Sequence, residues 1–144
     1  MTKTIRDILN TKGSDVYTIG ADANIFEALE RMAEKNIGAL LVMKDGKVVG
    51  IMSERDYARK VILQGRSSLQ TPIEKIMTKQ VCYALPSQTV EECLVLITEK
   101  RCRHLPVFDG STLVGMVSIG DLVKASIAEK EYMINQLENY IKAG

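Results

Sequence analysis

The sequence has little of what a disulfide-stapled or zinc-binding protein needs. Its 144 residues contain three cysteines and one histidine. The cysteines are odd in number and lack Cys-x-x-Cys spacing, which argues against a disulfide framework. We therefore expect reduced thiols, packed as small apolar groups, in a cytoplasmic protein. The single histidine has no partner ligands of the kind that complete a zinc site, so no metal centre is expected.

Long hydrophobic runs and an excess of one charge are also absent. No apolar stretch approaches the roughly 20 residues of a membrane span. The opening residues, MTKTIRDILN, lack the apolar core of a secretory signal. Lysine and arginine total 19 against 18 acidic residues, a net charge of +1. This balance argues against a broad basic surface, so we do not expect a nucleic acid as partner. Without an apolar span or a basic surface, we do not expect a membrane as partner either.

What the sequence does contain is an internal repeat. Residues 16–60 align without a gap with residues 81–125, 65 positions later, with about 11 identities in roughly 45 pairs. Both copies end in Gly-x-x-Ser-x-x-Asp, at 50–56 and 115–121. Two copies are too few for a solenoid, so a pair of copies that bury each other is the expected arrangement.

Each copy predicts the same order of elements, β-α-β-β-α. The predicted strands are 16–19, 39–43 and 48–52 in the first copy, and 81–84, 104–108 and 113–117 in the second. Asn24 and Thr89 are suited to cap the first helix of each copy, and Ser53 and Ser118 the second. Residues 4–9 (TIRDIL) also resemble residues 72–77 (PIEKIM) at an offset of 68.

The expected fold class is therefore α+β, with two pseudo-symmetric repeats packed sheet to sheet and a C-terminal helical extension. The expected boundaries are 1–66 for the first repeat, 67–128 for the second and 129–144 for the extension. Val123, Ile127, Ile134, Leu137 and Ile141 give the last part of the chain an amphipathic helical pattern. Such a helix suits a partner subunit, and the alternative is that it folds back on its own module.

The whole pattern resembles a tandem pair of CBS domains, the module named after cystathionine beta-synthase and called a Bateman module when paired. The resemblance spans residues 4–128 and rests on the repeat, on RHLPVFD (103–109) and on the two Gly-x-x-Ser-x-x-Asp endings. It implies a stand-alone regulatory module that binds an adenosine-containing ligand, such as AMP, ADP, ATP, NAD or S-adenosylmethionine, in clefts between the copies. It also implies a homodimer.

The resemblance assigns ribose binding to Asp56 and Asp121, and places Ser53 and Ser118 near the phosphate. The chemistry fits, because a carboxylate accepts hydrogen bonds from both ribose hydroxyls and a helix N-terminus attracts a phosphate. The other interpretation is a plain capped helix start, which uses the same residue types.

Basic residues near these motifs are candidates for phosphate contact. Arg55 is suited to bidentate binding, or it is a solvated surface residue. Its counterpart in the second copy is Gly120, so the two half-sites are expected to differ in charge. Arg103 and His104 precede a strand that faces the ligand in the family, although His104 is equally consistent with a packed core residue.

Residues that would hold the adenine are harder to identify. Tyr17, Ile51 and Met116 are candidates for a base pocket, and each is equally explained as part of the core.

No Ser-His-Asp order, metal-ligand cluster, Walker-type loop or Gly-x-Gly-x-x-Gly motif supports an enzyme, so no catalytic residue or catalytic cofactor is expected. The competing hypothesis is a structural dimerisation module with vestigial clefts. Any regulated target would be a separate, unidentified protein.

Overall fold

The computed structural model describes residues 2–143. Contacts divide the chain into two compact units. The central unit consists of residues 16–81, and the terminal unit combines the residues up to 15 with those from 82 onward. The sequence repeats expected at 1–66 and 67–128 therefore do not coincide with the compact units, because the chain's first helix joins the second repeat.

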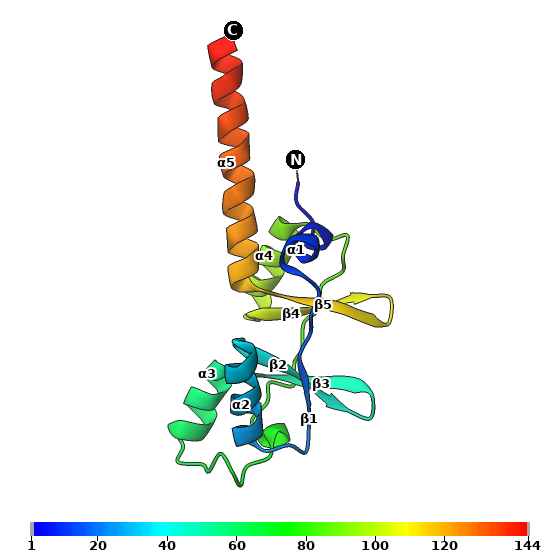
Figure 1. Ribbon diagram of the computed structural model, residues 1–144, viewed down its shortest axis with the longest axis vertical. Helices are drawn as coiled ribbons and strands as arrows, with labels where there is room; N and C mark the ends of the chain where they lie inside the picture. Colours follow the sequence, from blue (N-terminus) through cyan, green and yellow to red (C-terminus); the bar gives the residue numbers. More distant parts are fainter. Residues whose placement is uncertain (1, 144) are drawn as a thin grey trace. The chain divides into compact units, whose positions relative to one another are not determined.

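The central unit is a three-stranded sheet with helices (Figure 1). In chain order its elements are β1 (Thr18–Gly20), α2 (Ile25–Lys35), β2 (Ala39–Lys44), β3 (Lys47–Ser53), α3 (Glu54–Tyr57), η1 (Ala58–Ile62) and η2 (Ile73–Lys75). β1 runs parallel to β2, and β2 runs antiparallel to β3. Apolar side chains from α2, β2 and the 73–76 segment form its core.

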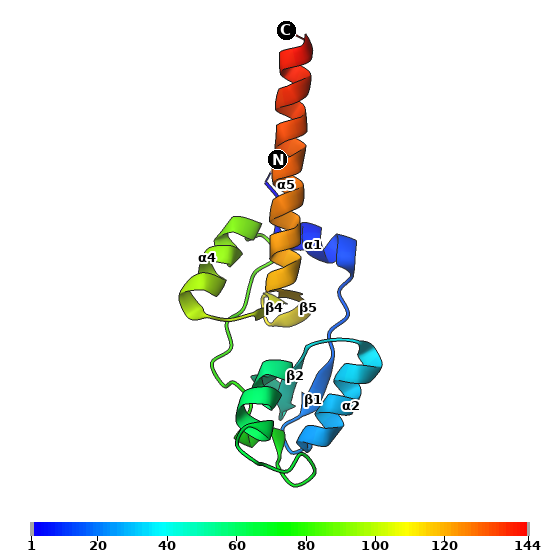
Figure 2. The ribbon, with the colours of Figure 1, turned by 90° about the vertical axis from the view of Figure 1, so that its left-hand side faces the viewer.

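The terminal unit is built on a two-stranded antiparallel sheet. Its elements are α1 (Ile5–Lys12), α4 (Val90–Lys100), β4 (His104–Asp109), β5 (Thr112–Ser118) and α5 (Ile119–Ala143). α1 and α4 lie on either side of α5 (Figure 2). The mixed helix and sheet content, the second copy of the hairpin and the C-terminal helix confirm the predicted α+β class.

The predicted caps are confirmed, and a tight turn joins the two strands of the first hairpin. The side chains of Asn24 and Thr89 accept hydrogen bonds from backbone N–H groups in the first turns of α2 and α4. Asp45 and Gly46 both have positive φ, as a two-residue hairpin turn between antiparallel strands requires. These features depend on neighbouring residues only, which is why a sequence pattern predicts them well.

The strand predicted at 81–84 is wrong. Only Ala84 pairs there, through an isolated parallel bridge to Val107. In the central unit the amide of Leu41 donates to the carbonyl of Tyr17, beside the first residue of β1. The residue equivalent to Leu41 is Pro106, which has no N–H to donate. The second copy therefore lacks the hydrogen bond that would extend the bridge into a strand.

The N-terminal segment of each repeat packs on the sheet of the other repeat. Leu9 of α1 lies against Gly115 on β5, and Met77 lies against Gly50 on β3. A β-carbon on either glycine would come within 3 Å of these side chains, so both glycines are needed for close packing. The echo between 4–9 and 72–77 thus marks two equivalent packing segments.

α5 is a single straight helix of 25 residues that continues past the rest of the terminal unit (Figure 1). Residues 131–141 are all exposed. The alternative in which the extension folds back on its own module is therefore wrong, because a helix without a break has no means of reversing direction. No helix within residues 2–143 combines the length and the apolar character needed to cross a membrane.

Candidate functional site

In the central unit, Ser53 ends β3 and caps α3. Its hydroxyl accepts from the amide of Asp56 at 3.2 Å, and the Asp56 carboxylate accepts in return from the amide of Ser53 at 3.0 Å. This reciprocal pair is a capping box, in which each side chain satisfies a backbone donor at the helix start. The motif therefore starts and caps a helix in this copy, and Ser118 and Asp121 form the same reciprocal pair in the other copy.

The second oxygen of Asp56 is also occupied. Its Oδ1 accepts from the Thr78 hydroxyl at 3.1 Å and lies 3.1 Å from the Lys60 ammonium. Lys60 also donates to the carbonyl of Ile76. The Asp56 side chain is only 10% exposed. Both carboxylate oxygens thus have partners within the unit, and little of their surface is open to a ligand.

The equivalent carboxylate in the terminal unit has a different environment. Asp121 Oδ2 accepts from the amide of Ser118 at 2.8 Å and from the ammonium of Lys12 at 2.7 Å. Lys12 also donates to the carbonyl of Met116 at 2.9 Å. The Asp121 side chain is 26% exposed, and both of its hydrogen bonds to Ser118 and Lys12 use the same oxygen. Asp121 is therefore the more open of the two motif aspartates.

Two opposing effects act on the pKa of Asp121. Partial burial raises the pKa, because it disfavours the charged carboxylate. The hydrogen bond from Lys12 and those from Ser118 favour the charged form and outweigh burial, so the pKa lies below its ordinary value of 3.8. The carboxylate is therefore ionised at neutral pH and is available as an acceptor.

The depressed pKa predicts that this ion pair stabilises the fold at neutral pH and is lost in acid. The unfolded chain binds a proton at Asp121 at higher pH than the folded chain does. The contribution should be complete above about pH 5 and should fall as the pH drops below about 4. Urea midpoints measured between neutral pH and about pH 3 should decline more steeply for the wild type than for Lys12→Met. Parallel curves for the two proteins would contradict the assignment.

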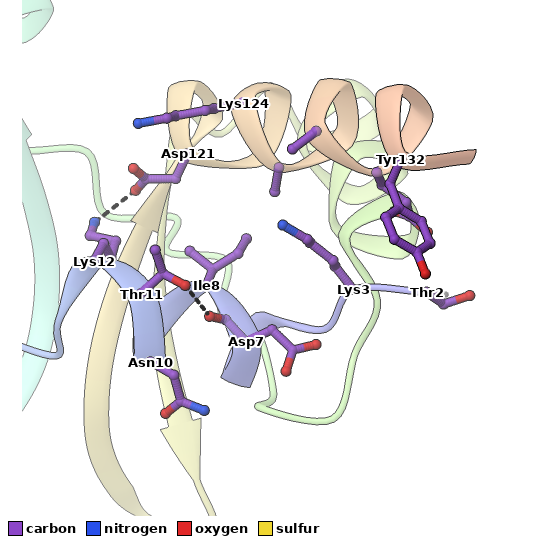
Figure 3. A pocket seen from close by; sticks show the side chains of 13 residues that line it. Thr2, Lys3, Asp7, Ile8, Asn10, Thr11, Lys12, Asp121, Lys124 and Tyr132 are labelled. Carbon is purple, nitrogen blue, oxygen red and sulfur yellow. Dashed lines mark hydrogen bonds and ion pairs between the residues drawn. The ribbon is translucent and has the colours of Figure 1, made fainter. Parts of the chain in front are cut away.

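A pocket of about 770 Å³ lies between α1 and α5, with Asp121 at one end (Figure 3). Its volume is within the range of small-molecule sites. Lys12 and Lys124 are near Asp121, and the ring of Tyr132 is at the far end. The full lining is Thr2, Lys3, Asp7, Ile8, Asn10, Thr11, Lys12, Asp121, Lys124, Ala125, Ala128, Glu129 and Tyr132. The lining thus combines three lysines with three acidic residues, and one of these, Asp121, is paired with Lys12.

Three other predicted residues gather near Asp121 in the terminal unit. His104 is directly opposite Ser118 in the β4–β5 pairing, and the carbonyl of Arg103 accepts from the amide of Ile119. Met116 contributes its carbonyl to Lys12. Arg103 is exposed and His104 is half-buried. The strand pairing therefore brings the basic segment to the start of α5, where Ser118 and Asp121 are found.

The remaining predicted residues belong to the central unit. Arg55 is exposed in the first turn of α3, and Ile51 pairs through its backbone with Thr78. Tyr17 packs against the core, and the ammonium of Lys35 lies 5.5 Å from the centre of its ring. A cation at this position is attracted to the ring face.

Three side chains that hold the aspartates were not predicted from the sequence. Lys60 follows Asp56 by four residues, a spacing that favours an ion pair on a helix and is visible in the sequence. Lys12 is 109 residues from Asp121, and Thr78 is 22 residues from Asp56. No local pattern connects those pairs, because the chain brings them together only by exchanging its N-terminal segments.

Comparison with known proteins agrees with this architecture. A CBS-domain protein from Burkholderia ambifaria MC40-6, described as a candidate signal-transduction protein, is 52% identical, with a TM-score of 0.84 over 88% of this chain and 95% of its own. The mitochondrial CBS domain-containing protein CBSX3 of Arabidopsis thaliana is 37% identical over 98% of this chain and 73% of its own length. A hexameric CBS-CP12 protein from bloom-forming cyanobacteria is 28% identical, with a TM-score of 0.80 over 99% of this chain and 87% of its own.

The profile of the CBS domain matches this chain twice, at residues 5–62 and at residues 73–128. Each match begins with one of the exchanged N-terminal segments and includes one Gly-x-x-Ser-x-x-Asp ending. The chain belongs to the CBS domain family and carries two copies of the domain.

Proposed function

We propose that this CBS domain pair is a regulatory module that binds an adenosine-containing nucleotide, such as AMP, ADP, ATP or NAD, at Asp121. The observation that carries the proposal is the open carboxylate of Asp121, which borders a pocket of about 770 Å³ beside two lysines. A carboxylate of this kind suits the two hydroxyls of a ribose, and the lysines suit phosphate oxygens.

The two motif aspartates are proposed to have different roles. Asp56 has partners on both oxygens and is 10% exposed, which supports a structural role. Asp121 has its hydrogen bonds on one oxygen and is more exposed. We therefore assign ribose binding to Asp121, with Ser118, Arg103 and His104 near the phosphate. Arg55, Ser53, Tyr17, Ile51 and Met116 remain secondary candidates.

Lys12 is proposed to change partners when the ligand binds. Without a ligand its ammonium neutralises Asp121 at 2.7 Å. Ribose hydroxyls on Asp121 would displace the ammonium, and a nearby phosphate would accept it through a charge-assisted hydrogen bond. Since Lys12 is on α1, the exchange would couple ligand binding to the position of α1. Such a coupling shifts a conformational population only if the ligand binds one arrangement more tightly.

The module is also proposed to self-associate and to act on a separate target protein rather than to catalyse a reaction. Self-association is supported by the hexameric assembly of the cyanobacterial relative, whose match includes 99% of this chain. Regulation is supported by the signal-transduction role suggested for the Burkholderia relative. A homodimer is the simplest assembly, because two-fold symmetric dimers are the commonest oligomers.

Calorimetric titration tests the binding proposal. Wild-type protein should bind at least one of AMP, ADP, ATP, NAD and S-adenosylmethionine. Asp121→Ala should weaken that binding by about 100-fold, the effect of losing two hydrogen bonds to a charged acceptor. Lys12→Met should weaken binding of ATP more than binding of adenosine, because only ATP has phosphates for the lysine.

The matched control is Glu99→Ala, which removes an exposed carboxylate of the same unit at the end of α4. It should leave every affinity within about twofold of the wild type, because surface charges away from a site contribute little. Failure of the wild type to bind any of these ligands would contradict the proposal and favour the structural dimerisation module. Unchanged affinity in Asp121→Ala would show that the ribose lies elsewhere.

A further inference from the structure

The exposed part of α5 carries an apolar stripe. Leu122, Ala125 and Ser126 are buried against the rest of the terminal unit, whereas every residue from 131 to 141 is exposed. The stripe is formed by Val123, Ile127, Ile134, Leu137 and Ile141, whose exposed fractions range from 43% to 73%. It is about 27 Å long, at about 1.5 Å of rise per residue. An apolar surface of this length on a projecting helix indicates an interface.

The stripe has the seven-residue period of a coiled-coil seam. Isoleucines stand at 127, 134 and 141, and a second set of seam positions falls at 123, 130 and 137. A seam built from two such sets packs knobs into holes on a second helix. The second set contains Val123, Lys130 and Leu137, so one charged residue interrupts an otherwise apolar seam.

We infer that this seam pairs with the seam of a second copy of the chain, with the two α5 helices antiparallel. In this register Val123 is opposite the partner's Ile141, and Ile127 is opposite the partner's Leu137. Lys130 is then opposite the partner's Ile134. Every other seam pair is apolar on both sides, and at this pair the aliphatic part of the lysine side chain lies against the isoleucine. The contact is isologous, because each pair occurs twice about a two-fold axis.

The two flanks of the seam support this direction. One flank is charged and contains Lys124, Glu131 and Glu138, while the other contains the exposed Met133 and Tyr140. In an antiparallel pair, the charged flank faces the charged flank of the partner helix, and the Met133–Tyr140 flank faces the same flank of the partner. Lys124 then faces the partner's Glu138 at two symmetric positions, and Met133 faces the partner's Met133. Glu131 faces the partner's Glu131 at the axis, a single repulsion that the two attractions offset.

A parallel pair would have less favourable contacts both along the flanks and in the seam. It would place the charged flank against the partner's methionine and tyrosine. It would also place Lys130 directly against the partner's Lys130 in the seam, and like charges in such a position are destabilising. Charge complementarity therefore selects a second copy in antiparallel orientation. This inference rests on the proposed self-association and goes beyond it, because it identifies the surface and its direction.

Sedimentation equilibrium of the full chain tests the inference through a charge swap. Lys124→Glu or Glu138→Lys alone replaces two attractions by two repulsions in each dimer, and should raise the dimer dissociation constant about tenfold. The double variant, Lys124→Glu with Glu138→Lys, should return the constant to within about twofold of the wild type. Leu137→Glu should raise it at least about 100-fold, because it buries a charge in the seam.

Asn139→Lys is the control, since it adds one positive charge next to Glu138 but off the seam. It should change the dissociation constant less than about twofold, and circular dichroism should show unchanged helix content in all variants. A double variant that stays as weak as either single variant would overturn the antiparallel register. If Leu137→Glu left the dissociation constant unchanged, α5 would not be the dimer surface, although self-association itself would stand. A wild type that remains monomeric at all concentrations would overturn both, and the nucleotide titration would still stand as a separate result.

Discussion

Replacing Asp56 by alanine is expected to lower the free energy of unfolding by about 3 kcal/mol, before any ligand is considered. The change removes the capping box with Ser53, which is worth about 1 kcal/mol. It also leaves the Thr78 hydroxyl and the Lys60 ammonium without their carboxylate partner. The loss of a partner from a largely buried group costs more than the loss of a surface contact. Urea unfolding at neutral pH measures the effect.

Ser53→Ala and Asp121→Ala separate the components of that loss. Ser53→Ala removes only the hydroxyl of the cap and should cost about 1 kcal/mol. Asp121→Ala should cost less than Asp56→Ala, because Asp121 is more exposed and Lys12 can be solvated. Equal losses at the two aspartates would contradict the division into a structural and a ligand-facing carboxylate. The comparison also matters for binding studies, since a weakened Asp56 variant could lose affinity simply by unfolding.

Gly50→Ala is the second large effect expected, with a loss of about 2 kcal/mol and a fall in Tm of about 6 °C. A β-carbon at this position would lie 2.6 Å from the Met77 sulfur and 3.0 Å from the carbonyl oxygen of Thr78. The Met77 side chain can move, but the Thr78 carbonyl is backbone that accepts from the amide of Ile51. Relief of the clash would therefore displace the 77–78 segment. Thermal unfolding followed by circular dichroism measures the shift.

Two matched glycine substitutions test this explanation. Gly38→Ala introduces the same methyl group into open space and should be neutral or slightly stabilising. Gly115→Ala meets the methyl groups of Leu9 at 2.7 Å, but these are the end of a flexible side chain. Its cost should fall between the other two, at about 1 kcal/mol. If Gly50→Ala and Gly38→Ala behaved alike, packing against the 77–78 segment would not explain the role of Gly50.

Several features of the candidate site could be predicted from the sequence because they involve close neighbours. Ser53 and Asp56 are three residues apart, as are Ser118 and Asp121, and each pair meets within one helical turn. The hairpin turn at Asp45-Gly46 is equally local. The failed strand at 81–84 shows the limit of such reasoning. Residues 81–84 have the residue types of a strand, but a strand there would need a backbone N–H at position 106. Residue 106 is a proline, which has no N–H and lies more than 20 residues further along the chain.

The repeat, the caps, the family and the order of elements apart from the strand at 81–84 follow from the amino-acid sequence alone, because they depend on residue types at fixed short spacings. The difference between the two motif aspartates emerges only in the folded chain. Thr78 and Lys60 contact a carboxylate oxygen of Asp56. Asp121 instead contacts Lys12, which lies near the other end of the chain, and it borders a pocket. From the residues, we expected the half-sites to differ at Arg55 and Gly120. The larger difference arises from the exchange of the N-terminal segments, which brings Thr78 to Asp56 and Lys12 to Asp121. The sequence does not reveal it, because contacts between residues far apart in the chain leave no periodic pattern.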